Sequence, residues 1–366
     1  MAALAASLLG IMAGVSGLEP REQEPDPPAA AAREPAPAPA VSPGLVLEPA
    51  GPGPGQGRHI VFLAGDEEYR SEEALPLLAS ILAGRHGFRC TVLFSLDPET
   101  GEIDPDEQTW MPGLEALEEA DLCVVFLRFR EWPDEQMAHF VRYVGSGRPL
   151  VGLRTATHAF DYRRRPESPY ARWSWDSREW PGGFGRQVLG ETWVAHHGVH
   201  GRESTRGVPD AAARRHPILR GVGPGVWGPT DVYAVRDLPA GTTVVLRGLV
   251  LQGMDPGDPP VEDGRNDPPM PLLWTRTWTS PGGPARVVCS TLGAARDLAA
   301  EDSRRLLVNA IYWALGLEDR IPETADVRPL APFEPSPFGF GRWRRGLRPA
   351  DLGAALQGAE TGGGGG

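Results

Sequence analysis

Five consecutive residues combine groups that could bind and transform a polar substrate. The segment Arg154–His158 carries a guanidinium, two hydroxyl groups and an imidazole directly after an apolar run. Arginine and hydroxyl groups suit sugar hydroxyls or an oxyanion, and imidazole is the usual proton-transfer group near neutral pH. We therefore expect Arg154 to orient a substrate oxygen, His158 to act as an acid or base, and Thr155 and Thr157 to bind substrate. The structural alternative is that Arg154 pairs with a neighbouring carboxylate.

The densest group of imidazoles in the chain lies between residues 191 and 200. Neutral imidazoles together with a carboxylate are the usual ligands of zinc and similar divalent ions. The sequence therefore allows a metal site made of Glu191, His196, His197 and His200, in which His197 also serves as a catalytic acid or base. The pattern His-His-x-x-His is not an established metal motif. A hydrogen-bonded histidine network that holds down a long loop is the alternative.

Aromatic and charged side chains accompany these segments. Four tryptophans are close to them in sequence: Trp173, Trp175, Trp180 and Trp193. Aromatic faces can stack on the apolar faces of sugar rings, although packing in the core is the commoner role of tryptophan. We expect Trp193 to contact a carbohydrate, and we expect further substrate-binding groups at Glu68, Tyr69, Arg70 and Arg128.

Strands ending at one edge of a sheet would bring these groups together. Apolar runs alternate with helical patterns in the first half of the chain, with strands expected at 59–64, 88–94, 121–127 and 149–153 and helices at 72–86 and 133–144. This alternation predicts an α/β domain with a mostly parallel sheet covered by helices on both faces. Ligands of such sheets settle at the carboxyl ends of the strands, where Glu68, Arg128 and Arg154 would meet.

The second half of the chain continues the sheet after a long irregular stretch. Residues 163–226 lack clear periodicity and are expected to form long loops over the carboxyl edge, which in compact domains are usually functional. Further strands are expected at 242–251, 272–275 and 286–291, and a last amphipathic helix at 302–315. The sheet is therefore expected to be completed by these later strands.

The two ends of the chain differ from this domain in composition. Residues 2–15 are apolar or small, and Val15-Ser16-Gly17 suits signal-peptidase cleavage, so we expect a signal peptide at 1–17 and an exported protein. A mis-assigned start codon and a short anchor are the alternatives, although the run is too short for a stable membrane span. Residues 18–57 resemble a Pro/Ala/Glu-rich disordered linker, residues 58–320 form the domain, and residues 321–366 form a Pro/Gly-rich tail.

Composition excludes several classes of chemistry. The chain contains no lysine, so it has neither a pyridoxal-phosphate anchor nor the lysine of a P-loop nucleotide site. A net charge of -12 disfavours nucleic acid as a partner, and a small carbohydrate is the partner we expect. The three cysteines, Cys90, Cys123 and Cys289, form no Cys-x-x-Cys pair, so a disulfide framework and a thiolate zinc site are both disfavoured.

Several segments, in matching order over residues 58–320, resemble the ThuA-like (trehalose utilisation) family: Gly65–Glu73, Gly152–Phe160, Gly190–Trp193, His196–His200, His216–Leu219, Thr230–Tyr233 and Arg304–Asn309. The resemblance implies a flavodoxin-like three-layer sandwich related to class I glutamine amidotransferases, a link to sugar metabolism, and a substrate-binding role for Asp231. Amidotransferases have a cysteine at a sharp turn after a strand, and the matching turn in this chain follows Gly152-Leu153. This chain has Arg154 and Thr155 at that turn, so it should not be a glutamine amidotransferase.

Two functions remain open from the sequence. The first is an isomerase- or hydrolase-like enzyme that acts on a carbohydrate or keto-sugar derivative, with His158 and a histidine of the 196–200 segment as acid and base and with a divalent metal such as zinc. The second is a non-catalytic carbohydrate-binding or structural module on the same fold. The missing cysteine favours the binding module, whereas the density of titratable groups favours the enzyme. The sequence does not indicate an oligomeric state.

Overall fold

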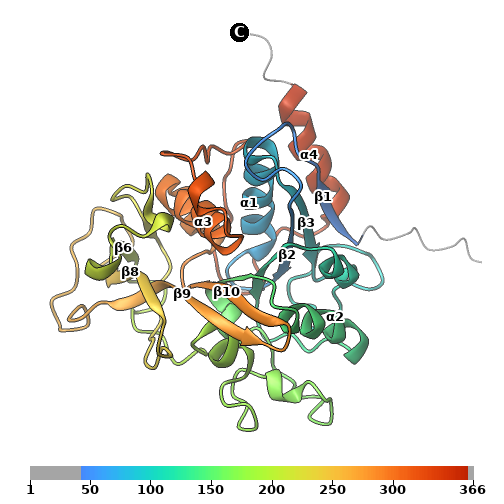
Figure 1. The fold of residues 1–366 in the computed structure, drawn as a ribbon, viewed down its shortest axis with the longest axis horizontal. Coiled ribbons are helices and arrows are strands. Elements are labelled where there is room, and N and C mark those ends of the chain that lie inside the picture. The colour runs from blue at the N-terminus through green and yellow to red at the C-terminus, as the bar shows by residue number, and fades with distance from the viewer. Residues whose placement is uncertain (1–42, 362–366) are drawn as a thin grey trace, which may run out of the picture. The chain divides into compact units, whose positions relative to one another are not determined.

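The computed structural model describes residues 43–361, which build one ten-stranded sheet with helices packed against it (Figure 1). The strand order across the sheet is β1-β3-β2-β4-β5-β10-β9-β8-β6-β7. The predicted signal peptide and most of the predicted linker lie outside the described residues. Within residues 43–361, no helix is both long and apolar enough to cross a membrane.

The inner part of the sheet is parallel and matches the predicted apolar runs. Its neighbouring strands are β3 (Arg89–Phe94), β2 (His59–Gly65), β4 (Leu122–Leu127), β5 (Leu150–Leu153) and β10 (Gly283–Ser290). Every residue of β2, β4 and β5 is buried. Strands covered on both faces read as continuous apolar runs, which is why the sequence reveals them.

The remaining strands pair antiparallel, so the predicted mostly parallel sheet is wrong for the molecule as a whole. They are β9 (Met270–Ser280), β8 (Thr243–Val250), β6 (Thr205–Pro209) and β7 (Trp227–Gly228) at one end and β1 (Gly44–Leu47) at the other. The physical reason is the connection: only Pro281 and Gly282 separate β9 from β10, and a loop this short joins only antiparallel strands. The flavodoxin-like relation stays a prediction.

The helices pack on the sheet through two separate cores. Helices α1 (Ser71–His86) and α3 (Glu301–Ala314) share one core with Ile60 and Phe62 of β2. Helix α2 (Asp134–Gly145) belongs to the other core, together with Val61 and Leu63 of the same strand. Because successive side chains of a strand point to opposite faces, β2 contributes to both cores.

The predicted linker and tail both contain segments that pack on the domain. Strand β1, inside the predicted linker, pairs with β3, and helix α4 (Pro349–Thr361) lies beside β1 (Figure 1). Between α3 and α4 the tail runs along α1, where Arg85 donates to the carbonyl of Arg328 and His86 bonds to the carbonyl of Asp326 at 2.8 Å. Donors at the end of α1 therefore supply the partners that the tail's carbonyl groups need.

Candidate functional site

Three residues in left-handed backbone conformations mark one edge of the parallel strands. Arg70, Phe129 and Arg154 have φ values of 63°, 53° and 44°, and they are the only residues other than glycine with positive φ in residues 43–361. They follow β2, β4 and β5 respectively. Such conformations cost roughly 1–3 kcal/mol each and persist only where surrounding contacts hold them, which is common at functional sites.

Arg154 is fully buried and acts on protein groups, in contrast to the predicted contact with substrate. Its guanidinium lies over the rings of Tyr69 and Tyr233, at 4.4 and 3.8 Å from the ring centres. It donates to the carbonyls of Asp231 and Thr291 at 2.7 and 2.8 Å, to Asp231 Oδ1 at 3.0 Å and to the Tyr69 hydroxyl at 3.1 Å. The alternative considered for this residue, pairing with a carboxylate, therefore describes the structure.

Asp231 brings two of the predicted metal-binding histidines together. Its Oδ2 lies 2.7 Å from His196 Nδ1, and its Oδ1 lies 3.1 Å from His200 Nδ1. Burial opposes ionisation of Asp231, but the charge of Arg154 and the hydrogen bonds from both imidazoles outweigh it and hold the pKa of Asp231 well below its ordinary value. The hydrogen bond to Asp231 is also the main reason why the pKa of His200 is raised.

This arrangement fits a divalent metal ion. One ligand atom from each of His196, His200 and Asp231 can be chosen so that all lie within 4.8 Å of one another. Two imidazoles and a carboxylate are a common ligand set for catalytic zinc, which keeps one position open. The side chains of His196 and His200 are 40% and 36% exposed, so an ion held there would have an accessible side. Glu68 Oε1, 3.4 Å from His200 Nε2, adds a second carboxylate.

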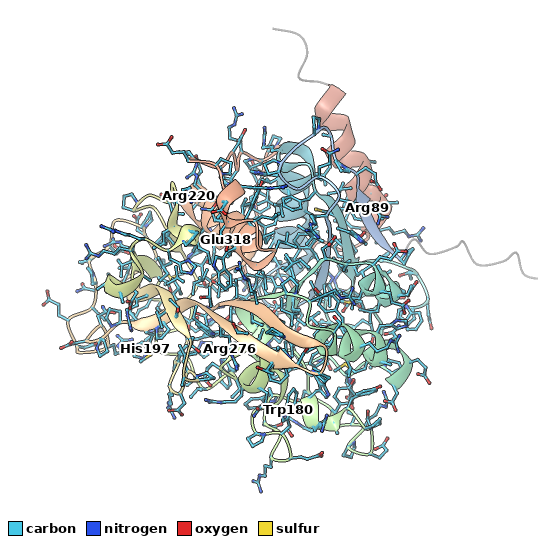
Figure 2. The ribbon with its side chains drawn as sticks, in the orientation of Figure 1. Arg89, Trp180, His197, Arg220, Arg276 and Glu318 are labelled. Carbon is cyan, nitrogen blue, oxygen red and sulfur yellow. The ribbon has the colours of Figure 1, made fainter. Side chains whose placement is uncertain are left out.

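The other two predicted metal ligands lie outside this group. His197 Nε2 bonds to the carbonyl of Arg265 at 2.9 Å (labelled in Figure 2). His196 forms an isolated antiparallel bridge with Tyr233 and the chain bends at His197, whose imidazole contacts Arg265 and not Asp231. His197 therefore lies outside the group formed by His196, His200 and Asp231, and its metal-binding and catalytic roles stay predictions.

Glu191 has a structural role. Its carboxylate accepts hydrogen bonds from the backbone amides of Thr192, Arg236 and Asp237 at 2.9, 2.9 and 3.2 Å, and it pairs with Arg186. These four partners satisfy a buried carboxylate and tie two loops together. Glu191 does not belong to the group of possible metal ligands formed by His196, His200 and Asp231.

His158 lies beside the metal-type cluster but is enclosed by aromatic rings. The ring centres of Phe129, Trp193 and Tyr233 lie 5.1, 5.8 and 6.2 Å from that of His158. Its Nδ1 is 3.1 Å from Thr157 Oγ1. Burial, followed by the positive charges of nearby arginines, lowers the pKa of His158 well below its ordinary value, so the imidazole is neutral at pH 7.

Charged groups after β2 and β4 form a second polar strip. Arg128 pairs with Glu67 and lies 3.7 Å from Glu68, and Arg130 donates to Glu67 at 2.8 Å. Burial is the largest influence on Glu68 and raises its pKa. Arg128 keeps part of its side chain exposed, whereas Arg130 is fully buried. Arg128 is therefore the most exposed member of this strip, and Glu68 lies beside it.

Three residues predicted to bind substrate, Thr155, Thr157 and Arg70, make hydrogen bonds to other protein groups. Thr155 donates its hydroxyl hydrogen to Asp66 at 2.6 Å, and Thr157 is occupied by His158. Arg70 donates to the carbonyls of Glu67 and of two residues in the tail. All three side chains are buried, so they stiffen the loops that carry the accessible groups.

A family model described as trehalose utilisation (ThuA) matches residues 60–314, which contain all of these groups. The chain belongs to the ThuA family. Solved ThuA-like proteins from Parabacteroides merdae and Bacteroides uniformis are similar to it, each at 15% identity, with TM-scores of 0.43 and 0.44. The first similarity covers 70% of this chain and 90% of the other, and the second covers 76% and 95%. None of the curated proteins matches the chain.

The four tryptophans that lie close to the histidines in sequence, Trp173, Trp175, Trp180 and Trp193, divide between two places in the structure. Trp193 packs against His158 and His196, each 5.8 Å away between ring centres, and Trp175 lies 5.9 Å from Trp193. Trp173 and Trp180 pair with each other at 5.0 Å in a separate cluster, and Trp180 lies at the lower edge of the view in Figure 2. Only two of the four can therefore contribute an aromatic wall to the site.

The cysteines of this ThuA protein all lie within strands. Cys90, Cys123 and Cys289 are buried in β3, β4 and β10, and burial raises the pKa of each thiol. The turn after β5 carries Arg154 in its left-handed conformation. The residue at this turn is thus an arginine, and none of the three cysteines lies there.

Sequence reasoning missed the tail as part of the site. Phe338 packs on Tyr69 and His200, with ring centres 5.8 and 5.5 Å apart, and Phe340 lies 5.0 Å from the guanidinium carbon of Arg128. Both phenylalanines lie beyond the part matched by the ThuA model. The available signal was the aromatic sequence Pro337-Phe338-Gly339-Phe340 within a tail that is otherwise rich in proline and charge.

Proposed function

We propose that this ThuA-family protein is an enzyme that acts on a carbohydrate or keto-sugar derivative with the help of a divalent metal ion. The observation that carries the proposal is the convergence of His196, His200 and Asp231 beside the neutral imidazole of His158. A purely structural histidine network would not require two partly exposed imidazoles around one buried carboxylate. The family description supplies the link to sugar.

Each side chain has a distinct part in this proposal. His196, His200 and Asp231 would hold the ion, which would polarise a carbonyl or hydroxyl oxygen of the substrate. Arg154 keeps Asp231 ionised and in place, so it is a positioning residue. His158 is unprotonated at pH 7 and so has a nitrogen free to accept a proton from the substrate, although its lowered pKa makes it a weak base until a ligand changes its surroundings.

The walls of the site suit a hydroxylated ring. Trp193 and Phe129 offer aromatic surface next to His158. Arg128 and Glu68 offer a hydrogen-bond donor and an acceptor within 3.7 Å of each other. Sugar-binding sites combine apolar surface with a few directed polar groups, and this combination supports a carbohydrate as the ligand.

A non-catalytic carbohydrate-binding module is the second candidate. The observation in its favour is the burial of His158, which is only 4% exposed and surrounded by aromatic rings. In that case sugar binding would persist without turnover, and substitution of His158 by Gln would leave binding intact. The enzyme proposal requires that this substitution removes turnover while binding changes little.

Metal content tests the proposal directly. We expect mass spectrometry of the purified protein to find a stoichiometric divalent metal, and we expect the double variant His196→Ala/His200→Ala to lose it. His197→Ala is the matched control, because it removes an imidazole from the same loop that points elsewhere. Equal metal content in all three proteins, or none in any of them, would contradict the metal site.

We also propose that the protein is exported. The support is the apolar run at residues 2–15, followed by Val15-Ser16-Gly17. Amino-terminal sequencing of the protein recovered outside the cytoplasm should begin after Gly17. Recovery in the cytoplasm with Met1 or Ala2 at the amino terminus would contradict export.

A further inference from the structure

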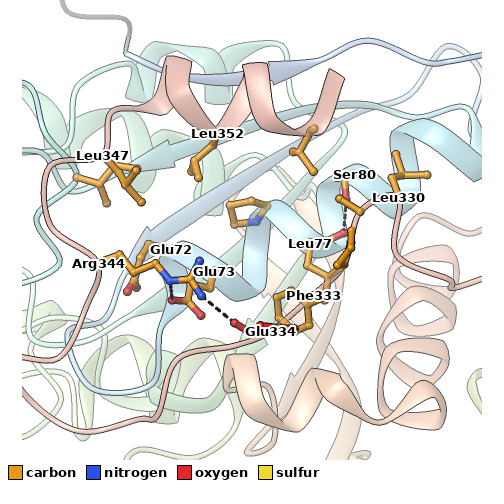
Figure 3. A pocket seen from close by; sticks show the side chains of 15 residues that line it. Glu72, Glu73, Leu77, Ser80, Leu330, Phe333, Glu334, Arg344, Leu347 and Leu352 are labelled. Carbon is orange, nitrogen blue, oxygen red and sulfur yellow. Dashed lines mark hydrogen bonds and ion pairs between the residues drawn. The ribbon is translucent and has the colours of Figure 1, made fainter. Parts of the chain in front are cut away.

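A cavity of about 200 Å³ lies between α1, the tail and α4, away from the histidine cluster (Figure 3). Its walls are mainly apolar and include Leu77, Leu330, Phe333, Leu347 and Leu352. An apolar cavity of about 150 Å³ in a protein core is large enough to hold benzene. The volume is therefore sufficient for a short aliphatic chain.

One end of this cavity carries a buried carboxyl group without a partner. Glu72 is 8% exposed, and neither of its side-chain oxygens has a hydrogen-bond partner from another described residue. Burial is the largest influence on Glu72 and raises its pKa to about 8. A buried polar group without a hydrogen-bond partner destabilises the folded protein, so a ligand that supplied a partner would gain affinity from it.

The charged groups around the cavity leave an excess of acid. Glu72, Glu73 and Glu334 line it, and Arg344 is the one basic residue among the lining side chains. Arg344 Nε lies 3.6 Å from Glu73 Oε1, and the other oxygen of Glu73 accepts from the amide of Ser336 at 2.7 Å. Figure 3 shows the Arg344 side chain directed to Glu73. Arg344 therefore neutralises Glu73 and leaves Glu72 unpaired.

We propose that this cavity binds an aliphatic amine, with the alkyl chain among the leucines and the ammonium group against Glu72. A buried carboxylate is stable when it is paired with a cation, and the apolar walls favour a chain over a hydrated ion. The amino end of α1 also favours a negative charge at Glu72, which would then lie between the helix and the ammonium. This site is independent of the proposed function.

Other occupants of the same size make different demands. An alcohol would use the apolar walls but would gain nothing from ionisation of Glu72. A carboxylate would place a second negative charge beside three glutamates, with only Arg344 to offset it. The comparison of hexylammonium, hexanol and hexanoate therefore separates a charged site from an apolar cavity and from an anion site.

Calorimetry on the full-length protein tests the proposal. We expect hexylammonium to bind at least tenfold more tightly than hexanol, and hexanoate to bind more weakly than either. Glu72→Gln should reduce hexylammonium affinity to that of hexanol, whereas the matched control Glu334→Gln, which removes an exposed carboxylate from the same rim, should change it by less than threefold. Equal affinities for hexylammonium and hexanol, or tightest binding of hexanoate, would overturn the proposal.

Proton release gives a second readout that needs no variant. The charged groups that act on Glu72 are Arg70, Glu73 and Asp66, and the tail adds Arg344 and Glu334 to the lining. Because Glu72 is mostly protonated at pH 7 and an ammonium favours its ionised form, binding should release a proton. Titrations at pH 7 in two buffers of different ionisation enthalpy measure that proton. Binding without proton release would contradict contact with Glu72.

Discussion

Two buried carboxyl groups of this molecule, Asp231 and Glu72, differ in their charge at pH 7: Asp231 is ionised, whereas Glu72 is mostly protonated. Asp231 is almost inaccessible, yet Arg154 and two imidazoles hold its pKa below the ordinary value. Glu72 has no hydrogen bond from the side chain or backbone of another described residue, and burial outweighs its own backbone amide and the charge of Arg70 and raises its pKa to about 8. Burial is the largest influence on both groups and acts in the same direction. Partners therefore decide which buried acid carries charge.

The two carboxyl groups also differ in which segments of the chain surround them. The partners of Asp231 come from segments far apart in sequence, including the turn after β5 and the loop that carries His196 and His200. Glu72 sits in the first turn of α1 and faces a cavity closed by the tail. The first arrangement gives its carboxylate a positively charged partner from within the chain, whereas the second lacks a positive charge at Glu72 itself.

Among the substitutions that test the contrast between Asp231 and Glu72, removal of Arg154 should change stability the most. Arg154→Met leaves Asp231 buried without its main positive charge, so we expect the free energy of unfolding to fall by about 3–5 kcal/mol. Urea denaturation at pH 7 measures the change. Arg142→Met is the control, because both Arg142 and its partner Glu118 are more than half exposed, and it should change stability by less than about 0.5 kcal/mol. Equal effects of the two substitutions would show that Asp231 does not depend on Arg154.

Glu72→Gln should change the pH dependence of stability. The folded-state pKa of about 8 lies above the ordinary value of 4.5, so the unfolded chain ionises first and wild-type stability falls as pH rises through this interval. Glutamine cannot ionise, so the stability of the variant does not fall in this pH interval through residue 72. We expect it to exceed the wild type by about 2–4 kcal/mol at pH 9, and to match it within about 0.5 kcal/mol below pH 4.5.

Denaturation at several pH values measures this difference. Hexylammonium added at pH 9 should restore most of the wild-type stability and should stabilise the variant much less, because only the wild type gains a partner for its carboxylate. A difference between the two proteins that stays constant from pH 4 to pH 9 would mean that Glu72 does not titrate with a raised pKa in the folded state.

The fold was predictable where strands are covered on both faces. Strands β2, β4 and β5 and helices α1 and α3 lie within one or two residues of the ranges expected from apolar runs and helical spacing. Strands β1, β6 and β7 were missed because each is five residues or shorter and lies towards an end of the sheet. Each of these short strands is only partly buried, so none of them forms a long continuous apolar run.

The site was predictable in residue types but not in partners. The sequence indicated histidines at 196–200 and an arginine at 154, and both lie at the site. Spacing alone could not separate His196 from His197, since their directions depend on the bridge to Tyr233 and on the bend at His197. The pairing of Arg154 with Asp231 spans 77 residues, and only the folded sheet brings them together.

The smallest predicted effect concerns the tail, which contacts both environments. Phe338→Ala removes an aromatic ring that packs on Tyr69 and His200. Aromatic pairs contribute about 0.5–1.5 kcal/mol. We therefore expect metal affinity at the histidine cluster to fall roughly two- to tenfold. Phe333→Ala removes the same ring from the cavity at Glu72 and should leave metal affinity unchanged while weakening hexylammonium. Competition with a chelator measures the first affinity, and calorimetry measures the second. If either substitution altered both affinities equally, the tail would couple the two environments, and the contrast between Asp231 and Glu72 would not be a property of separate sites.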